Sequence, residues 1–115
     1  MRVFITGIRG QLGSALTSVL QLDGHQVEGG DLPDWNILEP GRVLETFEAF
    51  RPDVVIHAGA LTRVDYCAEH PSEAVTVNGV GTYNVALACK RLGVRMAYIS
   101  TNEVFDGRAT RPYQE

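Results

Sequence analysis

Residues 2–13 read Arg2-Val3-Phe4-Ile5-Thr6-Gly7-Ile8-Arg9-Gly10-Gln11-Leu12-Gly13. The run over 2–6 is apolar and rich in β-branched and aromatic side chains, which predicts a short buried strand. Glycines then recur at every third position, and helical spacing of apolar residues predicts a helix over 11–22, closed by Asp23-Gly24. A strand, a glycine-rich turn and a helix in this order predict the start of an α/β unit.

The glycines Gly7, Gly10 and Gly13 have the spacing G-x-x-G-x-x-G. This spacing lets the backbone turn tightly and approach a pyrophosphate, which then lies on the free N–H groups and the positive end of the helix dipole. The third glycine also lets the helix pack closely against the sheet. A glycine-rich turn without a ligand is the alternative. Placed between a strand and a helix, the loop favours dinucleotide binding.

Strands and helices alternate along the rest of the chain. Continuous apolar runs predict strands and 3.6-residue periodicity predicts helices. We expect strands over 26–30, 54–58 and 95–100, an edge strand over 34–38, and helices from Pro40 to Arg51-Pro52-Asp53, over 64–70, and from Pro71 through Arg91 with Gly93 as C-cap. This order implies a parallel sheet with right-handed crossovers.

The predicted fold class is therefore α/β, a Rossmann-type doubly wound parallel sheet. The chain has 115 residues, which is short for such a fold when it binds a dinucleotide. We therefore expect the sheet to be truncated, with residues 1–115 forming the N-terminal part of a dinucleotide-binding domain. A C-terminal substrate domain would lie outside this sequence.

Asp31 follows the second expected strand, about 20 residues beyond the glycine loop, where a carboxylate can accept hydrogen bonds from the adenosine ribose. An aspartate that caps a loop is the alternative. Leu32 stands where a cation would help to bind a 2′-phosphate, and Arg9 is the one nearby cation that could replace it. The sequence thus favours NAD over NADP and leaves both open.

Three further segments follow expected strands, and ligands bind beyond the carboxyl ends of strands in open α/β sheets. Asn36 and Ile37 could flank an adenine. The small residues Ala58-Gly59-Ala60 would let a cofactor pass close, although they also suit a simple packed turn. In Ser100-Thr101-Asn102 a hydroxyl could reach a substrate carbonyl, or could cap a turn.

Some other residues favour structural roles. His57 lies inside an apolar strand, so we expect a buried or half-buried structural histidine, with a catalytic histidine as the alternative. Trp35 is expected to pack beside the adenine end or in the core. Cys67 and Cys89 have no metal-ligand spacing and form no disulfide framework, so reduced thiols are expected.

Composition narrows the class of protein. The net charge of −4 gives no footprint for nucleic acid, and no apolar run approaches the roughly 18 residues of a membrane span. The N-terminal residues enter a strand at once, without the features of a signal peptide. We expect a cytoplasmic protein without nucleic-acid or membrane partners.

The sequence resembles the extended short-chain dehydrogenase/reductase superfamily, and most of all its dTDP-4-dehydrorhamnose reductase branch. The likeness covers essentially the whole chain. It is carried by Thr6 through Gly13, Pro52 through Asp65, Glu73-Ala74 with Val77-Asn78, Ser100 through Gly107, and Pro112-Tyr113-Gln114-Glu115. The resemblance implies a nicotinamide cofactor, a sugar-nucleotide substrate, and either a homo-oligomer or a partner enzyme.

The resemblance also implies roles for individual residues. The loop glycines would bind pyrophosphate, Gln11 and Leu12 would contact the phosphates and the nicotinamide side, and Asp31 would face the ribose. Ala58, Gly59 and Ala60 would line the cofactor, with Thr62 near a ribose. Thr101 would be the hydroxyl of a catalytic triad that is completed by a Tyr-x-x-x-Lys pair.

The chain departs from the family pattern in four places. Asn36 replaces a usual aspartate, Gly59 a usual alanine, and Asn102-Glu103 a usual Asp-Tyr. Residues 1–115 contain no Tyr-x-x-x-Lys, because the only lysine, Lys90, has no tyrosine four positions before it. One hypothesis is thus a keto-deoxysugar-nucleotide reductase whose tyrosine and lysine lie elsewhere, with residues 1–115 inactive alone. The other is a non-catalytic dinucleotide-binding or regulatory subunit.

Overall fold

Four parallel strands form the centre of the computed structural model, which describes residues 1–113. Gln114 and Glu115, part of one family-like segment, lie outside the described residues. The strands are β1 (Arg2–Thr6), β2 (Gln26–Gly30), β3 (Val54–His57) and β4 (Arg95–Tyr98), in the order β2-β1-β3-β4. The Rossmann-type α/β prediction is confirmed. The strand order reverses between β1 and β3, which is where such sheets bind ligands.

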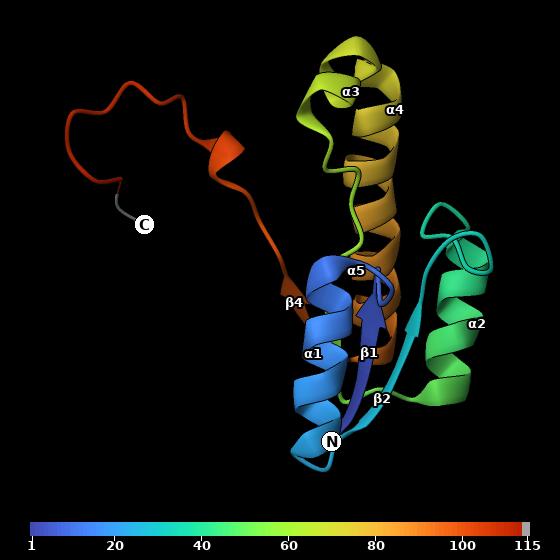
Figure 1. Ribbon diagram of the computed structural model, residues 1–115. Coiled ribbons are helices and arrows are strands. Elements are labelled where there is room, and N and C mark those ends of the chain that lie inside the picture. Colours follow the sequence, from blue (N-terminus) through green and yellow to red (C-terminus); the bar gives the residue numbers. More distant parts are fainter. Residues whose placement is uncertain (114–115) are drawn as a thin grey trace.

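Helices cover both faces of the sheet (Figure 1). Helix α1 (Gln11–Leu22) lies on one face, while α2 (Pro40–Phe50) and α5 (Thr82–Leu92) pack together on the other. The core between the sheet and helices α2 and α5 is aromatic, with Phe4, Trp35 and Phe47 in contact. Because side chains alternate along a strand, Val3 and Ile5 of β1 are buried on the face toward α1.

The helix expected from Pro71 through Arg91 is a single rod with an irregular middle. It consists of α4 (Pro71–Val75), the π-helix η1 (Thr76–Gly81) and α5, preceded by the short helix α3 (Val64–Glu69) (Figure 1). The rod ends at Leu92, and Gly93 takes the left-handed conformation expected of a C-cap, with a φ of 66°. A π-helical turn inside an α-helix often marks a functional site.

The prediction of an edge strand over 34–38 is wrong. The backbone turns there, with the Trp35 N–H donating to the Asp31 carbonyl at 2.9 Å and the Asn36 side chain accepting from the Leu38 N–H at 2.9 Å. The Trp35 ring folds onto Gly30, where a Cβ atom would lie 2.3 Å from it. The core position of the tryptophan therefore prevents an extended conformation.

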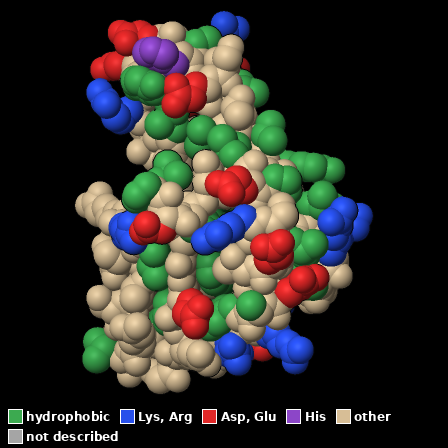
Figure 2. All heavy atoms as spheres, turned by 90° about the vertical axis from the view of Figure 1, so that its right-hand side faces the viewer, with side chains coloured by type: hydrophobic (Ala, Val, Ile, Leu, Met, Phe, Trp, Pro, Cys, Tyr) green, Lys and Arg blue, Asp and Glu red, His purple; other side chains and the backbone are tan. Residues whose placement is uncertain are grey.

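The charged side chains of the surface are mixed in sign on one face of the molecule. On the face that Figure 2 shows, acidic and basic side chains are intermixed and neither sign dominates. Beyond β4, the chain leaves the body of the fold, passes the short 3-10 helix η2 (Asn102–Val104), and is exposed through residue 113 (Figure 1). Among residues 1–113, no helix is both long and apolar enough to cross a membrane.

Candidate functional site

A cleft of about 760 Å³ opens at the carboxyl ends of β1, β3 and β4. This volume lies within the range of about 300–1,000 Å³ that small-molecule sites occupy. The cleft brings together most of the predicted site residues, namely Gly7, Gly10, Gln11, Leu12, Gly13, Asp31, Ala58, Gly59, Ala60, Thr62 and Thr101. Asn36 and Ile37 are not among its lining residues.

Two loops meet at the floor of this cleft. Gly7, which follows β1, has a φ of 70°, and its N–H donates to the Gly30 carbonyl at 2.8 Å. A Cβ atom on Gly7 would lie 2.7 Å from the Cα of Gly59, which follows β3. The backbones of the two loops therefore approach each other more closely than any side chain would allow.

The glycine loop leads directly into the N-terminus of α1. Gly10 is the N-cap and makes no side-chain capping bond. The first N–H groups of a helix have no acceptor within it, so those at the start of α1 remain available together with the positive end of the dipole. A Cβ atom on Gly13 would lie 2.1 Å from the Gly7 carbonyl oxygen, so glycine is required for the loop to pack onto the helix. This donor set fits a pyrophosphate.

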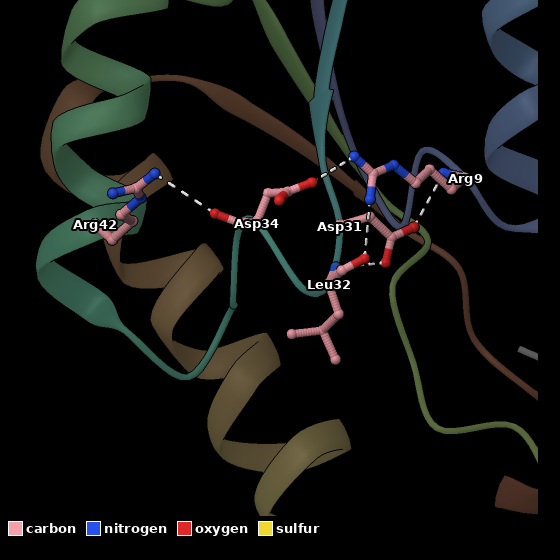
Figure 3. A network of polar contacts seen from close by, with 5 residues as sticks. All are labelled: Arg9, Asp31, Leu32, Asp34 and Arg42. Carbon is pink, nitrogen blue, oxygen red and sulfur yellow. Dashed lines mark hydrogen bonds and ion pairs between the residues drawn. The ribbon is translucent and has the colours of Figure 1, made fainter.

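Asp31 lines the cleft, and Figure 3 shows the polar contacts around it. One of its oxygens accepts from the Arg9 backbone N–H at 3.0 Å and the other from the Leu32 N–H at 2.9 Å. The Arg9 guanidinium donates to the Leu32 carbonyl at 3.1 Å and to the Asp34 carboxylate at 2.6 Å. The Asp31 carboxylate is thus fixed beside the glycine loop, and the Arg9–Asp34 ion pair lies next to it.

The two residues expected near adenine are engaged within the protein. The Asn36 side chain accepts from Leu38, as in an Asx turn. Ile37 packs against Gly81, and its carbonyl accepts from Asn84 Nδ2 at 3.0 Å. Their contacts explain the turn at 34–38, and an adenine contact by either side chain stays a prediction.

A directed hydrogen-bond chain passes through His57 and Thr82, which both line the cleft. The Thr82 hydroxyl donates its proton to the Asn78 carbonyl at 2.6 Å, so it accepts from Nε2 of His57 at 2.9 Å. Nδ1 of His57 then accepts from the Thr6 hydroxyl at 2.6 Å, which itself accepts from the Gly59 N–H at 3.0 Å. These contacts require a proton on Nε2 of His57 and fit the neutral tautomer, in which Nδ1 accepts.

Burial supports the same protonation state. His57 is 1% exposed, and its desolvation lowers the pKa of the imidazole from its ordinary value. The prediction that His57 is buried is confirmed. The ring connects Thr6 at the end of β1 to Thr82 at the start of α5, and it lines the cleft beside Ala58.

Asn78 in η1 holds that loop from the other side. Its Oδ1 accepts from the Leu61 N–H at 2.7 Å and its Nδ2 donates to the Leu61 carbonyl at 3.0 Å. Asn78 and Thr82 both line the cleft. From the sequence, Asn78 was named only within a family-like segment, without a role in the site, and Thr82 was not named. Two polar residues four positions apart lie on one face of a helix, and this spacing is the signal that could have found them.

Thr101 lies at the opposite wall of the cleft from the glycine loop's strand, beyond the end of β4. Its hydroxyl oxygen accepts from the Glu103 N–H at 3.2 Å, so it caps η2. The alternative of a turn-capping hydroxyl is therefore confirmed. Contact with a substrate carbonyl stays a prediction, since a capping hydroxyl still has a proton to donate.

Neither cysteine forms a metal or redox centre with its neighbours. Cys67 lines the cleft, while Cys89 is buried in the core, where desolvation raises the pKa of its thiol to about 11. Within residues 1–113, no group of His, Cys, Asp or Glu side chains is arranged to hold a metal ion.

The chain is similar to known proteins along its whole length. The family model described as "RmlD substrate binding domain" matches residues 1–115. The spore coat polysaccharide biosynthesis protein SpsK of Bacillus subtilis is 37% identical over 114 residues, which cover 99% of this chain and 40% of that protein. The chain therefore spans about 40% of the length of such relatives.

Solved structures agree with the sequence comparison. A dTDP-4-dehydrorhamnose reductase from Clostridium acetobutylicum has a TM-score of 0.92 and 36% identity, over 98% of this chain and 40% of that one. A dTDP-4-dehydrorhamnose reductase from Bacillus anthracis, solved in complex with NADP, has a TM-score of 0.89 and 34% identity, over 95% and 39% of the two chains. The chain belongs to the RmlD substrate binding domain family, in the dTDP-4-dehydrorhamnose reductase branch of the extended short-chain dehydrogenases/reductases.

Proposed function

We propose that residues 1–115 form the dinucleotide-binding part of a nicotinamide-dependent reductase that acts on a keto-deoxysugar nucleotide such as dTDP-4-dehydrorhamnose. The observation that carries the proposal is the single cleft shared by the glycine loop, Asp31 and Thr101. The names of the relatives, which include reductases of this class, support it. The protein would act in the cytoplasm, as a homo-oligomer or with a partner enzyme.

The cofactor would lie across the switch point between β1 and β3. The N–H groups at the start of α1 would bind its pyrophosphate, and Asp31 would accept from the adenosine ribose hydroxyls. Ala58, Gly59 and Ala60 would line its path, with Thr62 near a ribose, Gln11 and Leu12 toward the nicotinamide side, and Asn36 and Ile37 toward the adenine. When bound, a reduced nicotinamide supplies the hydride.

Thr101 would donate a hydrogen bond to the substrate carbonyl oxygen as negative charge develops there. Its hydroxyl lies at the end of β4 and already accepts from Glu103, which leaves its proton free for the substrate. A tyrosine and lysine outside residues 1–115 would supply and tune the proton donor.

The second candidate is a non-catalytic dinucleotide-binding or regulatory subunit. One feature of the sequence favours it, namely Asn102-Glu103 in place of the usual Asp-Tyr. This candidate needs the same cofactor site but makes no use of Thr101.

Titration of the full-length protein with NADH and NADPH tests both candidates. Gly10→Val should weaken binding at least about tenfold, because a branched side chain would fill the pyrophosphate position. Gly41→Ala in α2, where a Cβ meets open space, is the matched control. Unchanged affinity in Gly10→Val would overturn the loop assignment. A second assay separates the two candidates. Steady NADH oxidation by the wild type with dTDP-4-dehydrorhamnose would select the reductase, and no oxidation would select the binding subunit.

A further inference from the structure

We propose that Asp34 sets the cofactor preference of this site, because it engages Arg9 and thereby disfavours a 2′-phosphate. This inference rests on the proposed function. Figure 3 shows the geometry: the Asp34 carboxylate points toward the Arg9 guanidinium, beside the Asp31 carboxylate that lines the cleft. Neither Arg9 nor Asp34 lines the cleft, but the Arg9 backbone bonds to Asp31, which does, and Asp34 acts through its ion pair with Arg9.

Arg9 is the cation best placed for a phosphate on the adenosine 2′ position. Its backbone N–H donates to Asp31, which ties it to the carboxylate expected to meet that ribose. NADP differs from NAD by one phosphate group at this position, with a charge of about −1.5 to −2. An arginine can bind such a group through two parallel N–H donors, provided that its fork is free.

Both terminal nitrogens of Arg9 already donate to groups of the protein. One terminal nitrogen donates to the Leu32 carbonyl at 3.1 Å and the other to Asp34 at 2.6 Å. A 2′-phosphate would have to displace the Asp34 carboxylate or share the guanidinium with it, and the two anions would repel each other. The ribose hydroxyls of NAD need only Asp31 and make no demand on Arg9.

Arg42 does not replace Arg9 in this role. It approaches from the opposite side of the turn and reaches only the Asp34 carbonyl, at 3.5 Å (Figure 3).

The side chains of Arg9 and Asp34 are 60% and 70% exposed, so their ion pair is weak and can open. Asp34 therefore biases the choice of cofactor without excluding NADP.

The test is calorimetric titration of the full-length protein with NADH and NADPH. The wild type should bind NADH more tightly, and Asp34→Asn should shift the ratio toward NADPH by about threefold to tenfold while leaving the NADH affinity unchanged. Glu45→Gln, which removes one exposed negative charge from α2, should keep the wild-type ratio. An unchanged ratio in Asp34→Asn, with both nucleotides bound, would overturn this inference alone. Binding of neither nucleotide by the wild type would overturn the proposed function.

A second background separates the ion pair from simple repulsion. In Arg9→Gln, the further change Asp34→Asn should no longer favour NADPH, because no guanidinium remains to be released. An equal gain in both backgrounds would show that Asp34 repels the phosphate directly, and would overturn the role of the Arg9 pair. The wild-type dependence of the ratio on ionic strength should also weaken in Asp34→Asn, since salt screens the charges concerned.

Discussion

The hydroxyl oxygen of Thr6 lies 2.6 Å from Nδ1 of His57, and this buried contact joins the end of β1 to the end of β3. The two residues are also paired in register across the sheet. The Thr6 hydroxyl donates to Nδ1 and Thr82 accepts from Nε2. A second proton on the ring would force the Thr6 hydroxyl to turn and accept from Nδ1 as well as from the Gly59 N–H. The neutral ring is therefore part of the fold at the cleft.

We predict that protonation of His57 opposes folding. Its pKa in the fold is lowered from an ordinary value of 6.5, so the unfolded chain binds the proton first as the pH falls. The free energy of unfolding should then decrease below about pH 6.5, by at most about 1.4 kcal/mol per pH unit for one proton, and the contribution is fully present above that pH. Chemical denaturation at pH 7.5 and 5.5 measures the effect.

The variant His57→Gln should lower stability at pH 7.5 but reduce the loss between the two pH values. The matched control His70→Gln changes an exposed histidine and should keep the wild-type dependence on pH. If His57→Gln and the wild type lose the same free energy on acidification, the neutral buried ring does not account for the pH dependence.

The glycines of two helices should respond in opposite directions to alanine. At Gly13 a Cβ would lie 2.1 Å from a backbone oxygen, so Gly13→Ala should lower the free energy of unfolding by about 2–4 kcal/mol. At Gly41 nothing lies within 4 Å of the added atom, so Gly41→Ala should raise it by up to about 1 kcal/mol. Thermal or urea unfolding of both variants provides the comparison. Tolerance of alanine at Gly13 would contradict the tight contact between the loop and α1.

Local patterns in the sequence account for most of this fold. The strand and helix around the glycine loop have the bounds that the periodicity of residues 2–22 predicts, because apolar spacing and glycine act over a few positions. The turn at 34–38 was missed because Trp35 packs into the core, a tertiary effect that overrides strand propensity. Strand ends were overestimated by one or two residues at Ala58 and Ser100.

The candidate site shows the same division. Residues that follow strands could be predicted, since parallel strands end at one edge of the sheet. The partners of His57 could not, because Thr6 and Thr82 lie 51 and 25 positions away along the chain. The π-helix could not be predicted from the spacing of apolar residues either. It places Asn78 against Leu61, a contact between segments that no local pattern relates.

Asn78 should prove important for the loop over 58–63. Asn78→Ala removes both bonds to the Leu61 backbone, which should cost about 1–3 kcal/mol of stability and weaken the proposed nucleotide binding, because that loop lines the cleft. Thr76→Ala in the same helical segment loses only an exposed bond to the Ser72 carbonyl and serves as the control. Melting curves and nucleotide titrations would be compared. Equal behaviour of the two variants would show that Asn78 does not hold the loop.

Thr101 provides the sharpest separation between the two proposed functions. If the protein is a reductase, Thr101→Ala should lower kcat by about 10²–10⁴-fold and change nucleotide affinity little, since the hydroxyl faces the substrate carbonyl. Thr101→Ser keeps the hydroxyl and the capping of η2 and should retain most of the activity. Steady-state assays with a keto-deoxysugar nucleotide, beside NADH titrations, measure both properties. A Thr101→Ala variant with wild-type kcat would exclude the hydroxyl from the reaction, and equal losses in alanine and serine would point to the geometry of η2 instead.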